Sequence, residues 1–340
     1  MFVMRSSLVP LTCGCYNNPQ QRGERGVMGR IVVLGAVNVD IGGFSWEPLC
    51  GEDSNPGRVQ LSVGGVGHNI ACGCAQLGQS VSLMTALGGD ENAALVRADC
   101  ERRGIDLTYA LTLPDAATSC YLFIADSDGD MALAVNDMRI CDALTNDALA
   151  ASMKAIRAAD LLILDANLPA ETLRWAAQGA QCPVIADAVS AAKADRLSGA
   201  LPYIDRFKPN RIEAQRLTGI EVRGPEDAMR AARALCRMGA REVYLTMGTQ
   251  GVCCANGDEA FCLPGAKLSM VNATGAGDAF TAALAWSRLR GLNMRQSALA
   301  GMAAAGITAE SATTVADALS EGKLTERMKE IENELEGKRQ

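Results

Sequence analysis

The segment Val271-Asn-Ala-Thr-Gly-Ala-Gly-Asp-Ala-Phe280 is the most informative stretch of this 340-residue chain, and an alanine-rich helical pattern follows it. Glycine has no Cβ, so backbone N–H groups in such a turn can face an anion without obstruction. The following helix adds the positive end of its dipole. We therefore expect the amides of residues 275–277 to bind phosphate, and Asp278 to accept a proton from an attacking hydroxyl. The alternative is a glycine turn in which Asp278 only caps the helix.

A second glycine cluster, Gly64-Gly-Val-Gly-His-Asn69, follows a strand-like segment and opens another helical pattern. Close approach of a ligand to the backbone would explain the glycines, and Asn69 could then hold a sugar hydroxyl. The alternative is a tight turn from strand to helix. His68 is a candidate general base, although a packed histidine is commoner.

Two other phosphate-binding motifs are excluded by direct inspection. No Gly-x-x-x-x-Gly-Lys-Ser/Thr run occurs, so a P-loop is absent. Neither glycine cluster has a third glycine at the dinucleotide spacing, because Ile70 and Phe280 occupy those positions. A Rossmann dehydrogenase is therefore disfavoured.

Short apolar runs alternate with helical patterns along the chain, which indicates βαβ units around a mostly parallel sheet. The expected strands are residues 31–34, 161–164, 184–186 and 243–245, and the expected helices include 69–77, 226–238 and 279–289. Ligands of such sheets bind at the carboxyl ends of the strands. The polar residues at these ends are Asn38, Asp40, Asp165, Asn167, Asp187 and Asn210.

Three segments instead alternate with a period of two: residues 58–63, 119–125 and 131–136. The turn Asp126-Ser-Asp-Gly-Asp130 joins the last two as a hairpin. We interpret them as a half-buried antiparallel patch that forms a small lid, with strands within about 41–63 and 108–137. An exposed edge of this lid could pair with a second copy, which makes a homodimer plausible.

The bulk composition is that of a soluble globular protein in the cytoplasm. The net charge of −7 argues against a nucleic-acid partner, and no apolar run is long enough to cross a membrane. Thirteen cysteines accompany a single histidine, which favours free thiols in a reducing compartment over a metal cluster. Residues 1–28 are interpreted as a disordered extension, 29–320 as the domain, and 321–340 as a charged, solvated helix.

Five stretches, in order, resemble the ribokinase-like (PfkB) family of carbohydrate and nucleoside kinases. They are the two glycine clusters, Gly35-Ala-Val-Asn-Val-Asp40, Lys208-Pro-Asn-Arg-Ile-Glu213 and Thr246-Met-Gly-Thr-Gln-Gly251. The resemblance implies an α/β three-layer sandwich with a mostly parallel central sheet and a small β-sheet lid. It also implies ATP and Mg²⁺ as cofactors and a small nucleoside or sugar as substrate.

Within the family, the stretches 53–57, 118–121, 135–138 and 187–193 are most similar to those of pseudouridine kinases. That likeness implies phosphorylation of the 5′-hydroxyl of pseudouridine. The implied catalytic residues are Gly275, Ala276, Gly277 and Asp278. The implied substrate-binding residues are Asn38, Asp40, Gly64, Gly65 and Asn69 for the ribose, and Ser54, Asn55, Asn136 and Lys193 near the base. The implied nucleotide-binding residues are Asn210, Thr246, Gly248, Gly251 and Thr274, with Glu213 and Asn210 organising Mg²⁺ mainly through water.

Other readings stay open at this point. Many family members carry Asp where this chain has Asn272, which leaves dependence on a monovalent cation open. The substrate could instead be ribose, another nucleoside or a sugar phosphate. From a different class, the chain could be a non-catalytic regulator that binds a sugar or nucleotide on the same fold.

Overall fold

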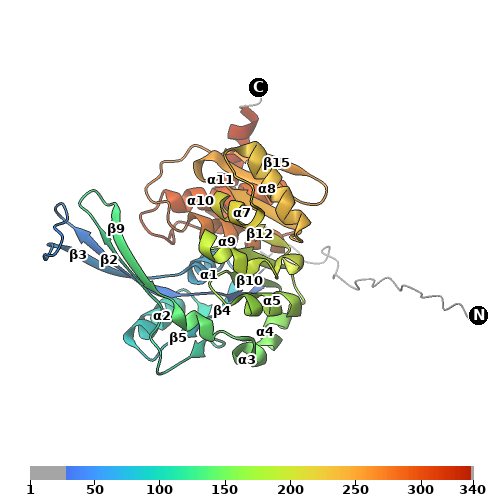
Figure 1. The fold of residues 1–340 in the computed structure, drawn as a ribbon. Helices are drawn as coiled ribbons and strands as arrows, with labels where there is room; N and C mark the ends of the chain where they lie inside the picture. The colour runs from blue at the N-terminus through green and yellow to red at the C-terminus, as the bar shows by residue number, and fades with distance from the viewer. Residues whose placement is uncertain (1–27, 338–340) are drawn as a thin grey trace, which may run out of the picture.

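The computed structural model describes residues 28–337, in which a nine-stranded sheet carries helices on both faces (Figure 1). The strand order is β15-β14-β13-β12-β11-β10-β1-β4-β6. The bounds are β1 Arg30–Leu34, β4 Ser80–Met84, β6 Ile105–Asp106, β10 Leu161–Asp165, β11 Val184–Asp187, β12 Arg206–Lys208, β13 Glu242–Thr246, β14 Gly251–Ala255 and β15 Ala260–Pro264. Neighbours from β13 to β6 are parallel, whereas β14 and β15 add an antiparallel hairpin at one edge. The predicted α/β fold is confirmed.

Alternate side chains of each central strand enter two separate cores. Ile31 and Val33 of β1 pack on one face of the sheet, and Val32 and Leu34 pack on the other. The first face is covered by α1 Val66–Gln76, α2 Glu91–Arg102, α9 Ala276–Leu289, α10 Met294–Ala309 and α11 Glu321–Gly337. The second is covered by α3 Asn146–Leu149, α4 Met153–Ala158, α5 Ala170–Gly179, α6 Ala191–Ala194, α7 Arg211–Thr218 and α8 Pro225–Arg237. Burial on both faces explains the continuous apolar runs of these strands.

A second sheet of four strands projects from the body (Figure 1). Its order is β3-β2-β8-β9, with bounds β2 Asn38–Ser45, β3 Gly57–Gly64, β8 Cys120–Ala125 and β9 Met131–Asp137. Two of its pairs are antiparallel, but β2 and β8 are parallel, so the expectation of a purely antiparallel patch was wrong. Residues 111–112 belong elsewhere: β7 Leu111–Thr112 pairs with β5 Ala86–Leu87.

The two ends of the chain stand differently against expectation. The predicted extension, residues 1–28, lies outside the described residues except for Met28. Helix α11 is charged, yet Leu324, Ile331 and Leu335 are buried in the core, so the interpretation of a fully solvated helix was wrong on that face. Among residues 28–337, no helix is both long and apolar enough to span a bilayer.

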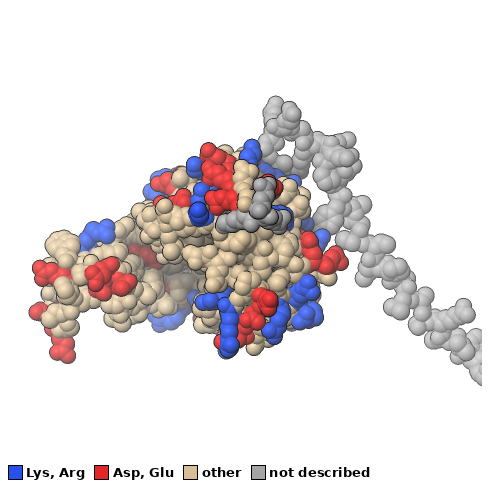
Figure 2. Space-filling model, turned by 90° about the horizontal axis from the view of Figure 1, so that it is seen from above, with Lys and Arg blue, Asp and Glu red and all other residues tan. Residues whose placement is uncertain are grey.

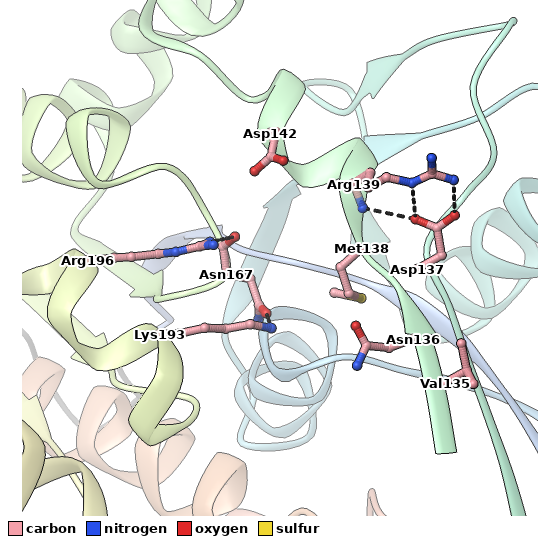
Figure 3. A pocket seen from close by; sticks show the side chains of 9 residues that line it. All are labelled: Val135, Asn136, Asp137, Met138, Arg139, Asp142, Asn167, Lys193 and Arg196. Carbon is pink, nitrogen blue, oxygen red and sulfur yellow. Dashed lines mark hydrogen bonds and ion pairs between the residues drawn. The ribbon is translucent and has the colours of Figure 1, made fainter. Parts of the chain in front are cut away.

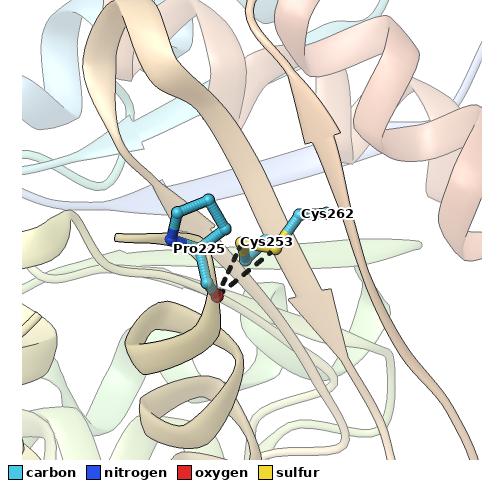
Figure 4. The surroundings of a disulfide bond; sticks show 3 residues. All are labelled: Pro225, Cys253 and Cys262. Carbon is cyan, nitrogen blue, oxygen red and sulfur yellow. Dashed lines mark hydrogen bonds between the residues drawn. A yellow bond between two sulfur atoms is a disulfide. The ribbon is translucent and has the colours of Figure 1, made fainter. Parts of the chain in front are cut away.

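Two cysteines form a disulfide, which corrects the expectation that the thiols are all free. Cys253 of β14 and Cys262 of β15 face each other directly across the hairpin and are bonded (Figure 4). Both sulfurs lie 3.6 Å from the carbonyl oxygen of Pro225, the first residue of α8. Spacing along the chain does not reveal this pair, because it depends on the register of the two strands.

Candidate active site

Asp278 and Asn69 meet where two helices begin. Asp278 lies in the first turn of α9, and Asn69 lies in the first turn of α1. The Asn69 side-chain amide donates a hydrogen bond of 2.8 Å to Oδ2 of Asp278. The structure therefore brings the two glycine clusters of the sequence together, although 209 residues separate these side chains.

Each of these helices is preceded by a glycine in the left-handed region. Gly65 has φ 98° before α1, and Gly275 has φ 83° before α9. A Cβ on Gly275 would collide with the carbonyl oxygen of Thr314, and one on Gly65 would lie 2.8 Å from that of Ala36. At each of these positions glycine is required for two reasons: the backbone conformation, and the close approach of another segment of the chain.

A buried ion pair lies beside Asp278. Lys208, the last residue of β12, places its Nζ 2.8 Å from Oδ2 of Asp187, at the end of β11. The same carboxylate accepts hydrogen bonds from the Thr281 hydroxyl (2.7 Å) and from the Val189 backbone N–H (2.9 Å). Lys208 and Asp187 are only 6% and 1% exposed, so the pair is shielded from solvent screening.

The position of Asp278 changes its acidity. Partial burial raises the pKa of this carboxyl to about 7, and the negative charge of Asp187 acts in the same direction. Lys208 and the hydrogen bond from Asn69 oppose that rise in pKa. Burial likewise raises the pKa of Asp165, at the end of β10, to about 6. A carboxyl group that titrates near neutrality suits proton abstraction from an alcohol.

Two further polar residues, Asn38 and Asp40, lie at the root of β2. The Asn38 amide donates to Asp40 Oδ1 at 2.5 Å, and burial raises the pKa of Asp40. Gly64 pairs with Asn38 across the sheet, and a Cβ on Gly64 would collide with the Asp40 carboxylate. A Cβ on Gly65 would come within 3.0 Å of Asn38 Oδ1. The residues expected to hold the ribose therefore form one cluster that continues through Asn69 to Asp278.

Asn136 and Lys193 line a cavity of about 510 Å³ (Figure 3). Asn136 and Met138 extend from one wall, and Lys193 and Asn167 extend from the other. Lys193 Nζ donates to Asn167 Oδ1 at 2.5 Å, and Arg196 donates to the Asn167 carbonyl at 2.6 Å. Because Asn167 follows Asp165 at the end of β10, this cavity lies at the edge of the sheet where the proposed base is found.

Ser54 and Asn55, by contrast, lie in the loop between β2 and β3, at the far end of the projecting sheet. The Asn55 side chain closes that loop, because it accepts from the Cys50 backbone N–H (2.7 Å) and donates to the Cys50 carbonyl (2.9 Å). Ser54 is exposed. The structure does not bring these two residues to the cavity.

Asn210 and Glu213 form a capping box at the start of α7. Asn210 Oδ1 accepts a hydrogen bond from the backbone N–H of Glu213 at 2.9 Å, and the Glu213 carboxylate accepts one from the backbone N–H of Asn210 at 2.7 Å. Burial raises the pKa of Glu213, which is 2% exposed, while nearby Lys208 lowers it. Both oxygens of the Glu213 carboxylate already accept hydrogen bonds from Asn210. This pair therefore fits a Mg²⁺ ion bound through intervening water better than one ligated directly.

The remaining candidates for nucleotide binding lie on both sides of this capping box. Thr246, at the end of β13, is bridged to Asn210. Gly248 has φ 60° in the turn before β14, Gly251 has φ 104° as the first residue of β14, and Thr274 lies exposed in the turn before α9. Of these candidates, Thr246 is the residue that the structure shows in direct contact with Asn210.

His68 is directed away from Asp278. Its Nε2 lies 2.8 Å from Oδ2 of Asp99 on α2, and the Cys72 sulfur is 3.4 Å from the same nitrogen. These three side chains could in principle hold a metal ion, but Asp99 is already paired with Arg102 and Arg103. The geometry therefore favours a packed histidine over a general base.

Sequence reasoning missed the contributions of Lys208 and Arg196, and it identified Asn167 only as a strand-end residue. Lys208 belongs to the Lys208–Glu213 motif, and the signal available for it was that a lysine at the end of a buried strand needs a partner. Its partner Asp187 was identified only as a strand-end residue. Arg196 gave no signal, because its contact is with a backbone carbonyl.

Comparison with known proteins agrees with this geometry. The pfkB family carbohydrate kinase pattern matches residues 28–320. A pseudouridine kinase of Escherichia coli strain K12 is 36% identical over 270 residues, which cover 78% of this chain and 86% of that protein. The structure of a carbohydrate kinase from Agrobacterium tumefaciens is 31% identical with a TM-score of 0.80, and the match covers 89% of this chain and 97% of the other. Arabidopsis thaliana ribokinase, solved with ribose and ATP, shares the fold at 23% identity and a TM-score of 0.79, over 89% and 99% of the two chains.

A match across this much of the chain, together with the shared fold, leads to one conclusion. The chain belongs to the pfkB family of carbohydrate kinases and is a phosphotransferase that acts on an alcohol group.

Proposed function

We propose that this enzyme transfers the γ-phosphoryl group of ATP to the 5′-hydroxyl of pseudouridine, with Asp278 as the general base. The observation that carries the proposal is the position of the Asp278 carboxylate, which is bound to Asn69 and lies next to the amides at the start of α9. The similarity to the Escherichia coli pseudouridine kinase supports the choice of acceptor. The Arabidopsis ribokinase structure with ribose and ATP supports the choice of donor.

In the proposed reaction, Asp278 takes the proton of the 5′-hydroxyl as that oxygen attacks the γ-phosphorus. The new bond joins this oxygen to phosphorus, the bond from phosphorus to the β-phosphate oxygen breaks, and ADP leaves. The amides of Gly275, Ala276 and Gly277 stabilise charge on the transferred group. Asn210 and Glu213 would hold Mg²⁺ through water, and the metal would supply neutralisation of charge on the phosphate oxygens.

The cavity of Figure 3 is the proposed site of the base. Lys193 and Asn136 present donors to it, which suits a ring with two carbonyl acceptors such as the uracil of pseudouridine. The projecting sheet acts as a lid that limits access of water to the phosphates. Ribose, or another nucleoside, is the second candidate acceptor, because the ribose-side cluster from Asn38 to Asn69 does not depend on the base.

The test is ADP release with Mg-ATP and a panel of pseudouridine, uridine, adenosine, cytidine, ribose and fructose 6-phosphate. We expect the highest kcat/KM with pseudouridine. Asp278→Asn keeps the size of the side chain but removes the base, so turnover should fall by about a hundredfold or more while pseudouridine still binds. Near-normal turnover in that variant would refute the assigned base. Binding without any phosphoryl transfer by the wild type would support a non-catalytic regulator instead.

We also propose that two copies pair through the projecting sheet. One face of that sheet carries apolar side chains at alternating positions, and five of them are 41–70% exposed: Val59, Leu61, Leu122, Leu133 and Val135. In Figure 2 the projecting part carries acidic side chains, several of them towards its end, and some basic ones, with uncharged residues between them. Apolar area of this extent is unusual on a surface that stays exposed to water.

A further inference from the structure

Lys208 occupies an unusual position for a lysine. It is 6% exposed at the end of β12, and a Cβ added to Gly277 would lie 3.0 Å from its Nζ. The ammonium group is therefore in contact with the turn whose amides are proposed to bind phosphate. A side chain at 277 would require the lysine ammonium to shift by a few tenths of an ångström.

Several carboxyl groups surround this ammonium. Asp187 comes from β11 and Glu213 from α7, and Asp278 faces Lys208 from α9. Asp165 from β10 also faces Asp278. Among the described residues, Lys208 is thus the ammonium that lies with these carboxyl groups, and its positive charge favours the ionised forms of Asp278 and Glu213.

Asp187 anchors the lysine rather than taking part in the reaction. Its two oxygens receive Lys208, Thr281 and the Val189 N–H, which leaves little capacity for a substrate proton. Val189 adopts φ 64°, a costly conformation for a β-branched residue. The chain tolerates this conformation at the point where the backbone turns to hold the Asp187 carboxylate.

We propose that Lys208, anchored by Asp187, is a positioning residue whose charge favours the ionised form of the base Asp278. The inference rests on the proposed function, in which Asp278 accepts the proton. Lys208 acts on Asp278 through space, because Asp187 and not Asp278 receives its short contact. The negative charge of Asp187 raises the pKa of Asp278, and the positive charge of Lys208 lowers it.

Two variants with opposite expected shifts test this. In Lys208→Met the cation is lost, so the acidic limb of the kcat/KM profile should move to higher pH by about one unit or more. In Asp187→Asn a neighbouring negative charge is lost and the ammonium is freed to approach Asp278, so the limb should move to lower pH. The loss of activity in Lys208→Met should be largest below neutral pH and should shrink by pH 9.

The controls separate this inference from the function on which it rests. Lys154→Met removes an exposed lysine on α4, and its profile should match the wild type. Circular dichroism and thermal melting check that each variant folds, and if Lys208→Met does not fold, the shift in Asp187→Asn decides alone. An unchanged limb, or an equal loss of activity at all pH values, overturns the role of Lys208 while leaving Asp278 as the base. An active Asp278→Asn overturns the assignment of Asp278 as the base, on which this inference rests.

Discussion

Asp278 should make the reaction sensitive to pH near neutrality. Its pKa is raised to about 7, mainly by burial, and only the ionised carboxylate can accept a proton. Activity is therefore expected above that pKa and should be lost as the pH falls through it. A kcat/KM profile for pseudouridine between pH 5 and 9 measures this, and a profile that stays flat down to pH 5 would contradict it.

Lys193 should distinguish nucleosides from free ribose. Lys193→Met removes the charged donor of the cavity, so the Kd for pseudouridine should rise about tenfold or more. The Kd for ribose should stay the same, because in the proposed pose the ribose is held by the cluster from Asn38 to Asn69 and not by this cavity. Calorimetry with both ligands tests this, and an equal weakening for both would place Lys193 outside the base site.

At the scale of elements, the capping box of α7 links local structure to the proposed Mg²⁺ site. Glu213→Gln retains an acceptor for the Asn210 N–H but removes a charge, so we expect a higher Mg²⁺ concentration for half-maximal rate and only a small loss of stability. A Mg²⁺ titration of the rate, with thermal melting as the control, measures both. A loss of stability with an unchanged Mg²⁺ titration would mean that Glu213 only caps the helix.

Elements that depend on local sequence could be predicted, and those that depend on long-range pairing could not. The apolar runs of β1, β10, β11 and β13 and the glycine turn before α9 were recognised because their signals lie within a few residues. The parallel pairing of β2 with β8, the disulfide and the buried face of α11 are set by contacts between distant segments.

The candidate site divides in the same way. The strand-end residues Asn38, Asp40 and Asp187 were identified because parallel strands share one functional edge. The contact between Lys208 and Asp187 was not identified, because it requires knowing that β11 and β12 are neighbours. The hydrogen bonds between Asn55 and Cys50 within one loop could not be predicted either, since they depend on the shape of that loop.

At the scale of the whole molecule, the apolar face of the projecting sheet predicts self-association. Leu61→Lys and Leu133→Lys should convert a wild-type dimer into monomers, because each places a charge in the proposed interface. Sedimentation velocity measures the change. Met238→Lys, a partly exposed position at the end of α8, is the control and should leave the assembly intact. A monomeric wild type would refute the proposed pairing.

One strand connects that outer surface to the chemistry. β2 is continuous from Asn38, buried at the body, to Ser45 near the tip, a span of about 25 Å. Because the strand is rigid, a tilt of its outer end also moves its inner end, where Asp40 lies. Substitutions at the outer end of the projecting sheet are therefore expected to change the Kd of the alcohol substrate, although these residues do not contact it.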